Sequence, residues 1–113
     1  MDTRLEKLRQ LGCGIDEAMD RFMNDEQLYL SCFENLLGDE SFEKLGSALQ
    51  NGDLENAFHY AHMLKSVYAN MGMDPIYKDC VVIVEAARDG NFTDDLLQSY
   101  DRMKAFMEKI KQI

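Results

Sequence analysis

The sequence predicts an all-α protein, an antiparallel up-down four-helix bundle with short additional helices at its N-terminus. Apolar side chains recur at intervals of three and four, as one buried face of a helix requires. The alternating pattern of a strand is missing, apart from a short apolar run at Val81–Val84 inside a longer helical stretch. Proline occurs once, and most of the seven glycines directly follow an apolar-periodic stretch, where helices end.

The glycines and the capping residues divide the chain into its elements. Gly12 and Gly14 separate two short helices at the N-terminus. Asn24, with Gln27 three residues later, has the spacing of a capping box at the start of the next helix. The seven expected helices are residues 3–11, 15–23, 25–37, 41–51, 53–71, 75–89 and 92–111. Short loops between the long helices imply antiparallel neighbours, which is the basis for the bundle.

Two further single residues support these assignments. Pro75 is expected at the first position of the helix that it opens, where its missing N–H costs nothing. Gly46 lies inside the predicted helix 41–51, where glycine costs about 1 kcal/mol relative to alanine. We therefore expect Gly46 to mark a place of close packing.

Length and charge limit the class of protein. A chain of 113 residues is one domain, residues 1–113. With 21 acidic and 12 basic side chains the net charge is -9, which argues against nucleic-acid partners and against an anionic membrane surface. No apolar run approaches the ~18–20 residues that a membrane span needs, and the N-terminus lacks the apolar core of a secretory signal. We expect a free-standing, monomeric cytoplasmic protein.

The three cysteines agree with a reducing compartment. They form no CxxC motif and no close pair, so neither a disulfide framework nor a zinc site is expected. Cys32 and Cys80 lie in apolar helical segments and are expected in the core. Cys13 lies between two glycines in a predicted turn, where we expect it to be exposed.

The stretch 53–73 carries the side chains that could take part in a chemical reaction. At 100° per residue, an apolar stripe lies opposite His62 on the helical wheel. This stripe, expected to be buried, consists of Tyr60, Leu64, Val67 and Met71, with Ala57, Ala61 and Tyr68 at its edges. His62 and Lys65 are expected to be exposed on the other side.

The surroundings of His62 suit a nitrogen nucleophile. An exposed neutral imidazole is nucleophilic near pH 7, and Lys65, one turn away, can pair with anionic oxygens on a group attached to it. Ser66 and Ala69 are small and leave the surface low enough for another protein to approach. Phosphoryl transfer depends mainly on positioning and charge stabilisation, which a rigid helix with a nearby cation provides.

The run Ala61-His62-Met63-Leu64-Lys65-Ser66, continuing to Gly72, resembles the signature of histidine-containing phosphotransfer (HPt) domains. The resemblance extends from about residue 14 to residue 110, and it implies a four-helix bundle that passes a phosphoryl group between phospho-aspartyl receiver domains. It also implies that His62 is the phospho-acceptor, that Lys65 stabilises the phosphoryl oxygens, and that Arg88 is a secondary basic residue near the site. The implied partners are response-regulator receiver domains, hybrid histidine kinases, or both.

Two positions depart from the family pattern. Ser66 stands where glycine is usual, and Tyr68 stands where a small residue is common. They leave open the alternative of a degenerate HPt-like module that binds receiver domains without relaying phosphate. The expected partner-binding residues are Phe58, His59, Ser66 and Ala69, and these would serve either function.

Other functions were weighed against the relay. Glu55, His59 and His62 share one helix face and could ligate a metal, but a di-iron bundle site needs histidines from a second helix, and the chain has only two histidines. His59 lacks the Leu and Lys neighbours at the offsets that His62 has, so it is expected to be an ordinary surface residue. No glycine-rich phosphate loop is present, so we expect a stoichiometric carrier, with no cofactor and no metal, rather than an enzyme.

Overall fold

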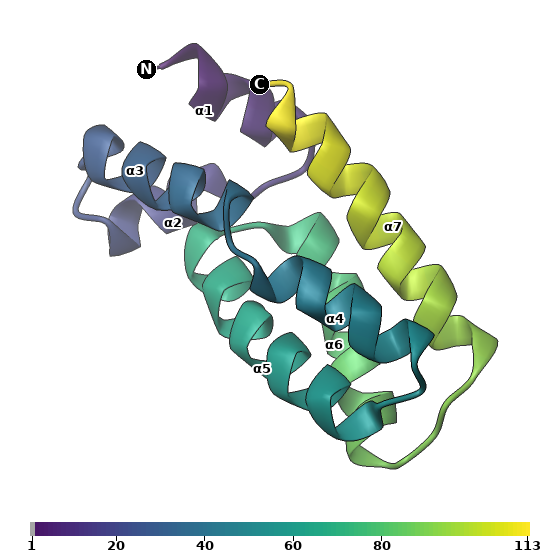
Figure 1. The fold of residues 1–113 in the computed structure, drawn as a ribbon. Helices are drawn as coiled ribbons and strands as arrows, with labels where there is room; N and C mark the ends of the chain where they lie inside the picture. Colours follow the sequence, from purple (N-terminus) through teal and green to yellow (C-terminus); the bar gives the residue numbers. More distant parts are fainter. Residues whose placement is uncertain (1) are drawn as a thin grey trace.

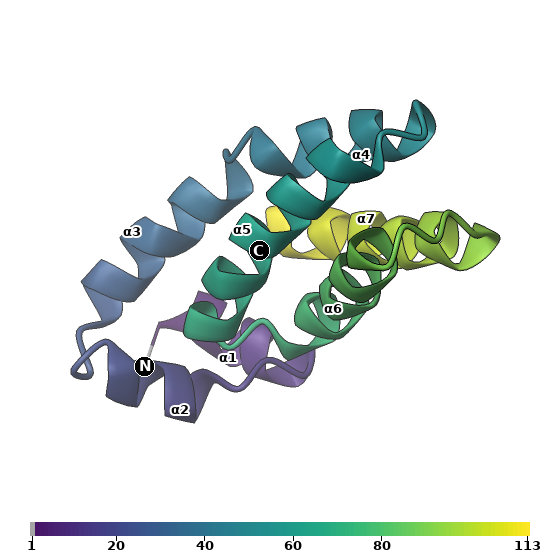
Figure 2. The same ribbon diagram turned by 90° about the horizontal axis from the view of Figure 1, so that it is seen from below.

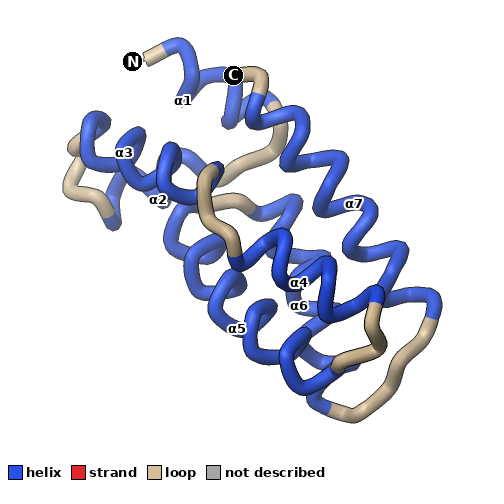
Figure 3. The backbone as a smooth tube through the Cα atoms, viewed as in Figure 1, coloured by secondary structure: helices blue, strands red, loops and turns tan. Residues whose placement is uncertain are grey.

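The computed structural model describes residues 2–113, which form seven helices and no strand. Connections of two to five residues join the helices (Figure 3). The helices are α1 (Thr3–Gln10), α2 (Ile15–Arg21), α3 (Glu26–Leu37), α4 (Ser41–Gln50), α5 (Leu54–Met71), α6 (Asp74–Arg88) and α7 (Asp94–Lys111). The all-α prediction is confirmed, and each helix end lies within two residues of its expected place. None of the described helices is both long and apolar enough to cross a membrane.

Four helices, α4 to α7, form an elongated bundle in a molecule of 42 × 23 × 20 Å. Helix α5 packs against both α4 and α6. In Figure 1, α4 lies in front of α6, with α5 on one side of this pair and α7 on the other. The short connections make sequence neighbours into spatial neighbours of opposite direction. The helix that carries His62 is therefore held from two sides, by α4 and by α6.

The three N-terminal helices cover one end of this bundle. Figure 2 shows α3 and α4 following one another along α5, with α1 and α2 lying across the end of the bundle. Leu5 and Leu8 of α1, like Ile15 and Ala18 of α2, are fully buried or nearly so and belong to the same core as the bundle. The short N-terminal helices are thus part of the domain core.

The N-terminal part of the chain also supplies hydrogen-bond donors to the carbonyl groups at the end of α5. The last carbonyl groups of a helix have no partner within it, and they need donors from elsewhere. Here three residues, which we call the α5 clamp (Gly14, Arg21 and Tyr29), donate to them. The bonds are Arg21 Nη2 to the Ala69 oxygen (2.9 Å), Arg21 Nε to the Asn70 oxygen (3.1 Å), the Tyr29 hydroxyl to the Met71 oxygen (2.7 Å) and the Gly14 N–H to the Gly72 oxygen (2.8 Å).

Gly72 ends α5 in a conformation that only glycine adopts without strain. Its φ is +70°, and a Cβ there would lie 2.5 Å from the Gly14 carbonyl oxygen. The close approach lets the chain before α2 pass directly under the end of α5. The sequence expectation of a glycine stop after this helix is confirmed.

The buried face of α5 differs from the predicted one, which the helical wheel centred opposite His62. Leu64 and Met71 are buried as predicted, but Tyr60 and Val67 are only partly buried. The fully buried residues include three that the wheel placed at the edge of the stripe: Ala57, Ala61 and Tyr68. The reason is that α5 makes its largest contact with α6, which turns its buried face about 40° toward that helix.

Two local expectations were wrong. The N-cap of α3 is Asp25, whose carboxylate accepts the Leu28 N–H at 3.0 Å, while Asn24 has a left-handed backbone with φ of 59° and forms no capping box. Cys13 is buried, with its Sγ 3.7 Å from the Met73 sulfur, because the turn that contains it packs against the start of α6. Cys80 is buried as expected and Cys32 is partly buried.

Gly46 marks close packing between α4 and α7, as expected. Any Cβ at this position would collide with the Tyr100 hydroxyl. That hydroxyl donates a 2.8 Å hydrogen bond to the Phe42 carbonyl oxygen, and the Tyr100 ring stacks on Phe42 with 5.0 Å between ring centroids. The glycine therefore lets Tyr100 fasten α7 to the first turn of α4.

Candidate functional site

His62 lies in the middle of α5 with its side chain exposed to solvent. The helix around it is fixed at both ends. At the start, the Asp53 carboxylate accepts the Asn56 N–H at 3.1 Å, and at the end the α5 clamp holds the last carbonyls. The imidazole is therefore presented on a rigid support, and the predicted exposure of His62 is confirmed.

An exposed strip, the His62 face, runs along α5 on the side away from the core. It contains five exposed side chains: Glu55, His59, His62, Ser66 and Ala69. Their spacing of three and four residues places them one above another. Ser66 and Ala69 keep the strip low beyond His62, so a partner surface can reach the imidazole.

Phe58 connects His62 with helix α6. The ring centroids of Phe58 and His62 are 5.5 Å apart with a tilt of 33° between the ring planes. The guanidinium carbon of Arg88, in the last turn of α6, lies 5.7 Å from the Phe58 centroid, in the geometry of a cation–π contact. Three of the predicted site residues, from two helices, thus meet around one phenyl ring.

A groove of about 240 Å³ follows the same seam between α5 and α6. It is lined by Leu54, Glu55, Phe58, Ala87 and Arg88. Its floor is apolar and its rim carries one positive and one negative charge. The groove opens beside the His62 face, where the sequence predicted partner contacts but indicated no groove.

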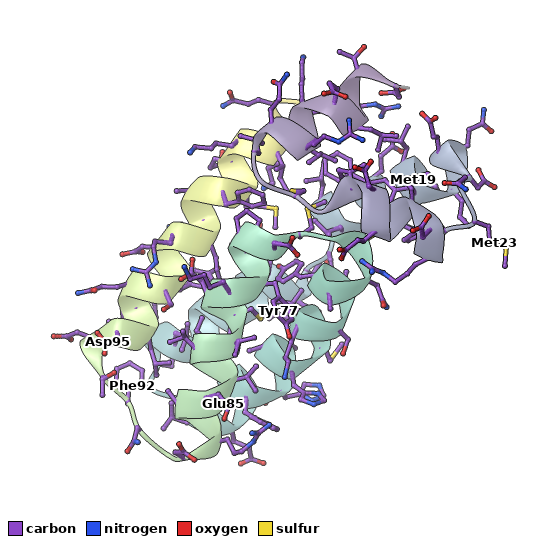
Figure 4. All side chains as sticks on the ribbon, turned by 180° about the vertical axis from the view of Figure 1, so that it is seen from behind. Met19, Met23, Tyr77, Glu85, Phe92 and Asp95 are labelled. Atoms are coloured by element: carbon purple, nitrogen blue, oxygen red, sulfur yellow. The ribbon has the colours of Figure 1, made fainter. Side chains whose placement is uncertain are left out.

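Glu85 is a neighbour of the site that was not predicted from the sequence. Its carboxylate oxygens accept two hydrogen bonds from Arg88 Nη1, at 3.1 and 3.2 Å, and both side chains are about half exposed. Figure 4 shows Glu85 on α6 toward the connection that carries Phe92, with Tyr77 on the same helix. The i,i+3 spacing of Glu85 and Arg88 on a predicted helix was the available signal for this pair.

Lys65 lies one turn after His62 and is partly buried rather than substantially exposed as predicted. The reason is the same turn of α5 toward α6, which brings Lys65 near Cys80. Burial raises the pKa of the Cys80 thiol to about 12, and the positive charge of Lys65 acts in the opposite direction. Lys65 comes one turn after His62, and Arg88 lies over Phe58, one turn before it, so two cations lie near His62 on a protein with a net charge of -9.

His59 and Met63 complete the surroundings of His62. The His59 ring contacts its neighbour Tyr60, with centroids 5.2 Å apart, and takes no part in the contacts around Phe58. Met63 is 46% exposed on the α4 side of the strip. At 100° from His62 on the wheel, it fell between the predicted core and the predicted face.

A metal site at Glu55, His59 and His62 finds no support in the geometry. Among residues 2–113, no group of three or more His, Cys, Asp or Glu side chains is arranged to hold a metal ion. What the arrangement can do chemically is offer an accessible imidazole nitrogen, with cations nearby, to an anionic group brought by another protein.

One of the comparisons with known proteins identifies a family. The sequence model of the family described as "Hpt domain" matches residues 30–113, which comprise most of α3 and all of α4 to α7. No curated protein and no solved structure matches the chain. The matched region contains His62, Lys65, Phe58, Glu85 and Arg88, whereas all three residues of the α5 clamp lie before it.

Proposed function

The chain belongs to the Hpt domain family, and from that premise we propose that His62 accepts a phosphoryl group from a phospho-aspartyl receiver domain and passes it to another. Members of this family act in phosphorelays as phosphoryl carriers rather than as enzymes. The single observation that carries the assignment to His62 is its exposure at the middle of a helix that is fixed at both ends.

The transfer needs only a nucleophile and charge stabilisation from this chain. The unprotonated nitrogen of the neutral His62 imidazole attacks phosphorus, and the P–O bond to the partner's aspartate breaks. The electron pair of that bond stays on the aspartate as carboxylate, and the other imidazole nitrogen keeps its proton. The reverse step, onto the aspartate of a second receiver, makes and breaks the same two bonds.

Lys65 has the role of stabilising the transferred group in this proposal. A phosphoryl group carries roughly two negative charges, and a charged donor within reach strengthens its binding. Lys65 is one helical turn from His62, on the side that faces α6. Arg88 is the second cation, held one phenyl ring away from His62.

The partners in this proposal are response-regulator receiver domains, alone or as parts of hybrid histidine kinases. The docking surface includes Phe58, His59, Ser66 and Ala69, with Met63 at its edge. The protein acts in the cytoplasm as a monomer and binds no ATP, so its phosphate comes from partners alone.

A labelling experiment tests the proposal. The protein is incubated with phosphorylated receiver domains, and the chain is then assayed for acid-labile, base-stable phosphate. The wild type and the His59→Gln variant are expected to take up the label, and His62→Gln to remain unlabelled with an unchanged fold, because an exposed side chain contributes little to stability.

Two other outcomes have distinct meanings. A label on His59 would contradict the assignment of the acceptor. Receiver binding without any label would instead support a degenerate module, for which Ser66, exposed beside His62 in place of the usual glycine, would be the feature to examine.

A further inference from the structure

The pairing of Arg88 with Glu85 has a consequence if His62 is phosphorylated. In the unphosphorylated protein the Arg88 guanidinium has two partners, the Glu85 carboxylate and the face of the Phe58 ring. The same ring contacts the His62 imidazole. Because both groups contact the Phe58 ring, the guanidinium and the imidazole are no farther apart than the sum of their two distances to the ring centroid. The arginine side chain is long and half exposed, so a change of rotamer can shorten this separation.

We propose that Glu85 pairs with Arg88 over the Phe58 ring while His62 is unphosphorylated, and that phosphorylation of His62 draws Arg88 away from Glu85 onto the phosphoryl group. The inference rests on the proposed function and adds a regulation to the same site. Glu85 is then a residue that sets how strongly this chain retains phosphate, by competing for a cation.

The charges and exposure of the groups favour this exchange. Glu85 carries one negative charge, whereas a phosphoryl group carries roughly two and offers three acceptor oxygens to the planar fork of arginine. The Glu85–Arg88 pair is half exposed on both sides, so breaking it costs little in water. The cation–π contact does not depend on the carboxylate, so it keeps the guanidinium on the ring that contacts His62 while Arg88 leaves Glu85.

The proposal predicts that a substitution removing a negative charge strengthens phosphate retention through Arg88. Glu85→Gln is expected to shift the equilibrium of phosphoryl transfer from a receiver domain toward this chain by about two- to five-fold, the effect of one exposed ion pair. Asp89→Asn is the matched control, since Asp89 is an exposed acid at the end of the same helix. It changes net charge equally and is expected to give a smaller shift.

Double variants separate the action of Arg88 from general electrostatics. Glu85→Gln in an Arg88→Gln background is expected to give no gain over Arg88→Gln alone, and Phe58→Leu is expected to reduce the gain, because leucine keeps the apolar volume without a ring face. A gain in Glu85→Gln that equals that of Asp89→Asn, or that persists without Arg88, would overturn the proposal.

A second measurement works without any receiver. Phosphoramidate can phosphorylate the imidazole directly: its P–N bond breaks, ammonia leaves, and the N–P bond to His62 forms. The Arg88 Nε–H signal in ¹⁵N NMR is expected to move on loading of the wild type, and its position before loading to change in Glu85→Gln. An Arg88 signal that loading leaves in place would contradict the exchange. If phosphoramidate labels His62 but no receiver domain exchanges a phosphoryl group with the chain, the proposed function is refuted. The NMR measurement still decides whether Arg88 changes partner.

Discussion

The Tyr29 hydroxyl donates a 2.7 Å hydrogen bond to the carbonyl oxygen of Met71, the last residue of the helix that carries His62. Both residues are buried, and they lie 42 positions apart. Burial raises the pKa of Tyr29, so its hydroxyl stays protonated and remains a donor well above neutral pH. Tyr29 comes directly before the region that matches the family, so this bond ties the unmatched N-terminal part of the chain to the helix that carries His62.

Tyr29→Phe is expected to lower the free energy of unfolding by about 1–3 kcal/mol, because it leaves the buried Met71 carbonyl without a donor. Denaturant unfolding monitored by circular dichroism measures the change. Tyr77→Phe is the control: among the described residues, the partly buried Tyr77 hydroxyl has no hydrogen-bond partner, so that variant is expected to keep its stability within about 0.5 kcal/mol. Equal losses in both variants would show that the bond to Met71 adds nothing.

Gly46→Ala is expected to destabilise the bundle by about 1–3 kcal/mol, although alanine is the better helix former. The added methyl group collides with the Tyr100 hydroxyl and must displace the ring that stacks on Phe42. Thermal unfolding compares this variant with Ser47→Ala, an exposed change on the same helix. If Gly46→Ala is as stable as Ser47→Ala, then α7 moves to accept the methyl group without a loss of stability.

The helices were predictable because their signals are local. Apolar spacing, capping carboxylates and terminal glycines act within a few residues, and each helix lies where these signals put it. The direction of the buried face of α5 was less predictable. Whether Val67 or Tyr68 is buried depends on which neighbour the helix contacts most, and that is a property of the whole bundle.

In the candidate site, too, local features were predictable from the sequence and long-range contacts were not. The exposure of His62 followed from its own helix, whereas the contact of Phe58 with Arg88 joins residues 30 positions apart and no spacing rule indicates it. The wrong expectation for Cys13 has a related cause. Two flanking glycines indicate a turn correctly, but they carry no information on what covers it, and here the start of α6 does.

The buried thiols predict that the protein loses stability in alkali. Burial raises the pKa of Cys80 and of Cys13 to about 12, from 9.0 for an unperturbed thiol. Between these values the folded state binds more protons than the unfolded state, so stability falls as pH rises. Each thiol contributes a slope of up to about 1.4 kcal/mol per pH unit above pH 9. The partly buried Tyr100, whose pKa desolvation raises to about 12, adds to this slope above pH 10.

Unfolding midpoints in denaturant at pH 8 and pH 10.5 measure this slope. A variant with Cys13→Ala and Cys80→Ala is the control, and its midpoint is expected to fall less over the same interval, whatever its stability at pH 8. Parallel pH profiles for this variant and the wild type would show that the thiols do not cause the alkaline loss.

Lys65→Ala is expected to lower phosphoryl transfer or shorten the lifetime of the phosphohistidine by about 10- to 150-fold, the equivalent of one charge-assisted contact of about 1.5–3 kcal/mol. Lys65 is partly buried on the α6 side of His62, and partly buried charges are screened less than those on an open surface. The domain also carries a net charge of -9, so a local cation is expected to matter more. Receiver docking should change little, because the surrounding contact residues remain. Lys104→Ala removes the same charge from α7, in the groove between α4 and α7, and serves as the control. Transfer rates measured with a phosphorylated receiver at low and moderate salt decide the matter: equal rates for the two variants would remove Lys65 from the site and leave His62 to act with cations supplied by Arg88 and by the partner.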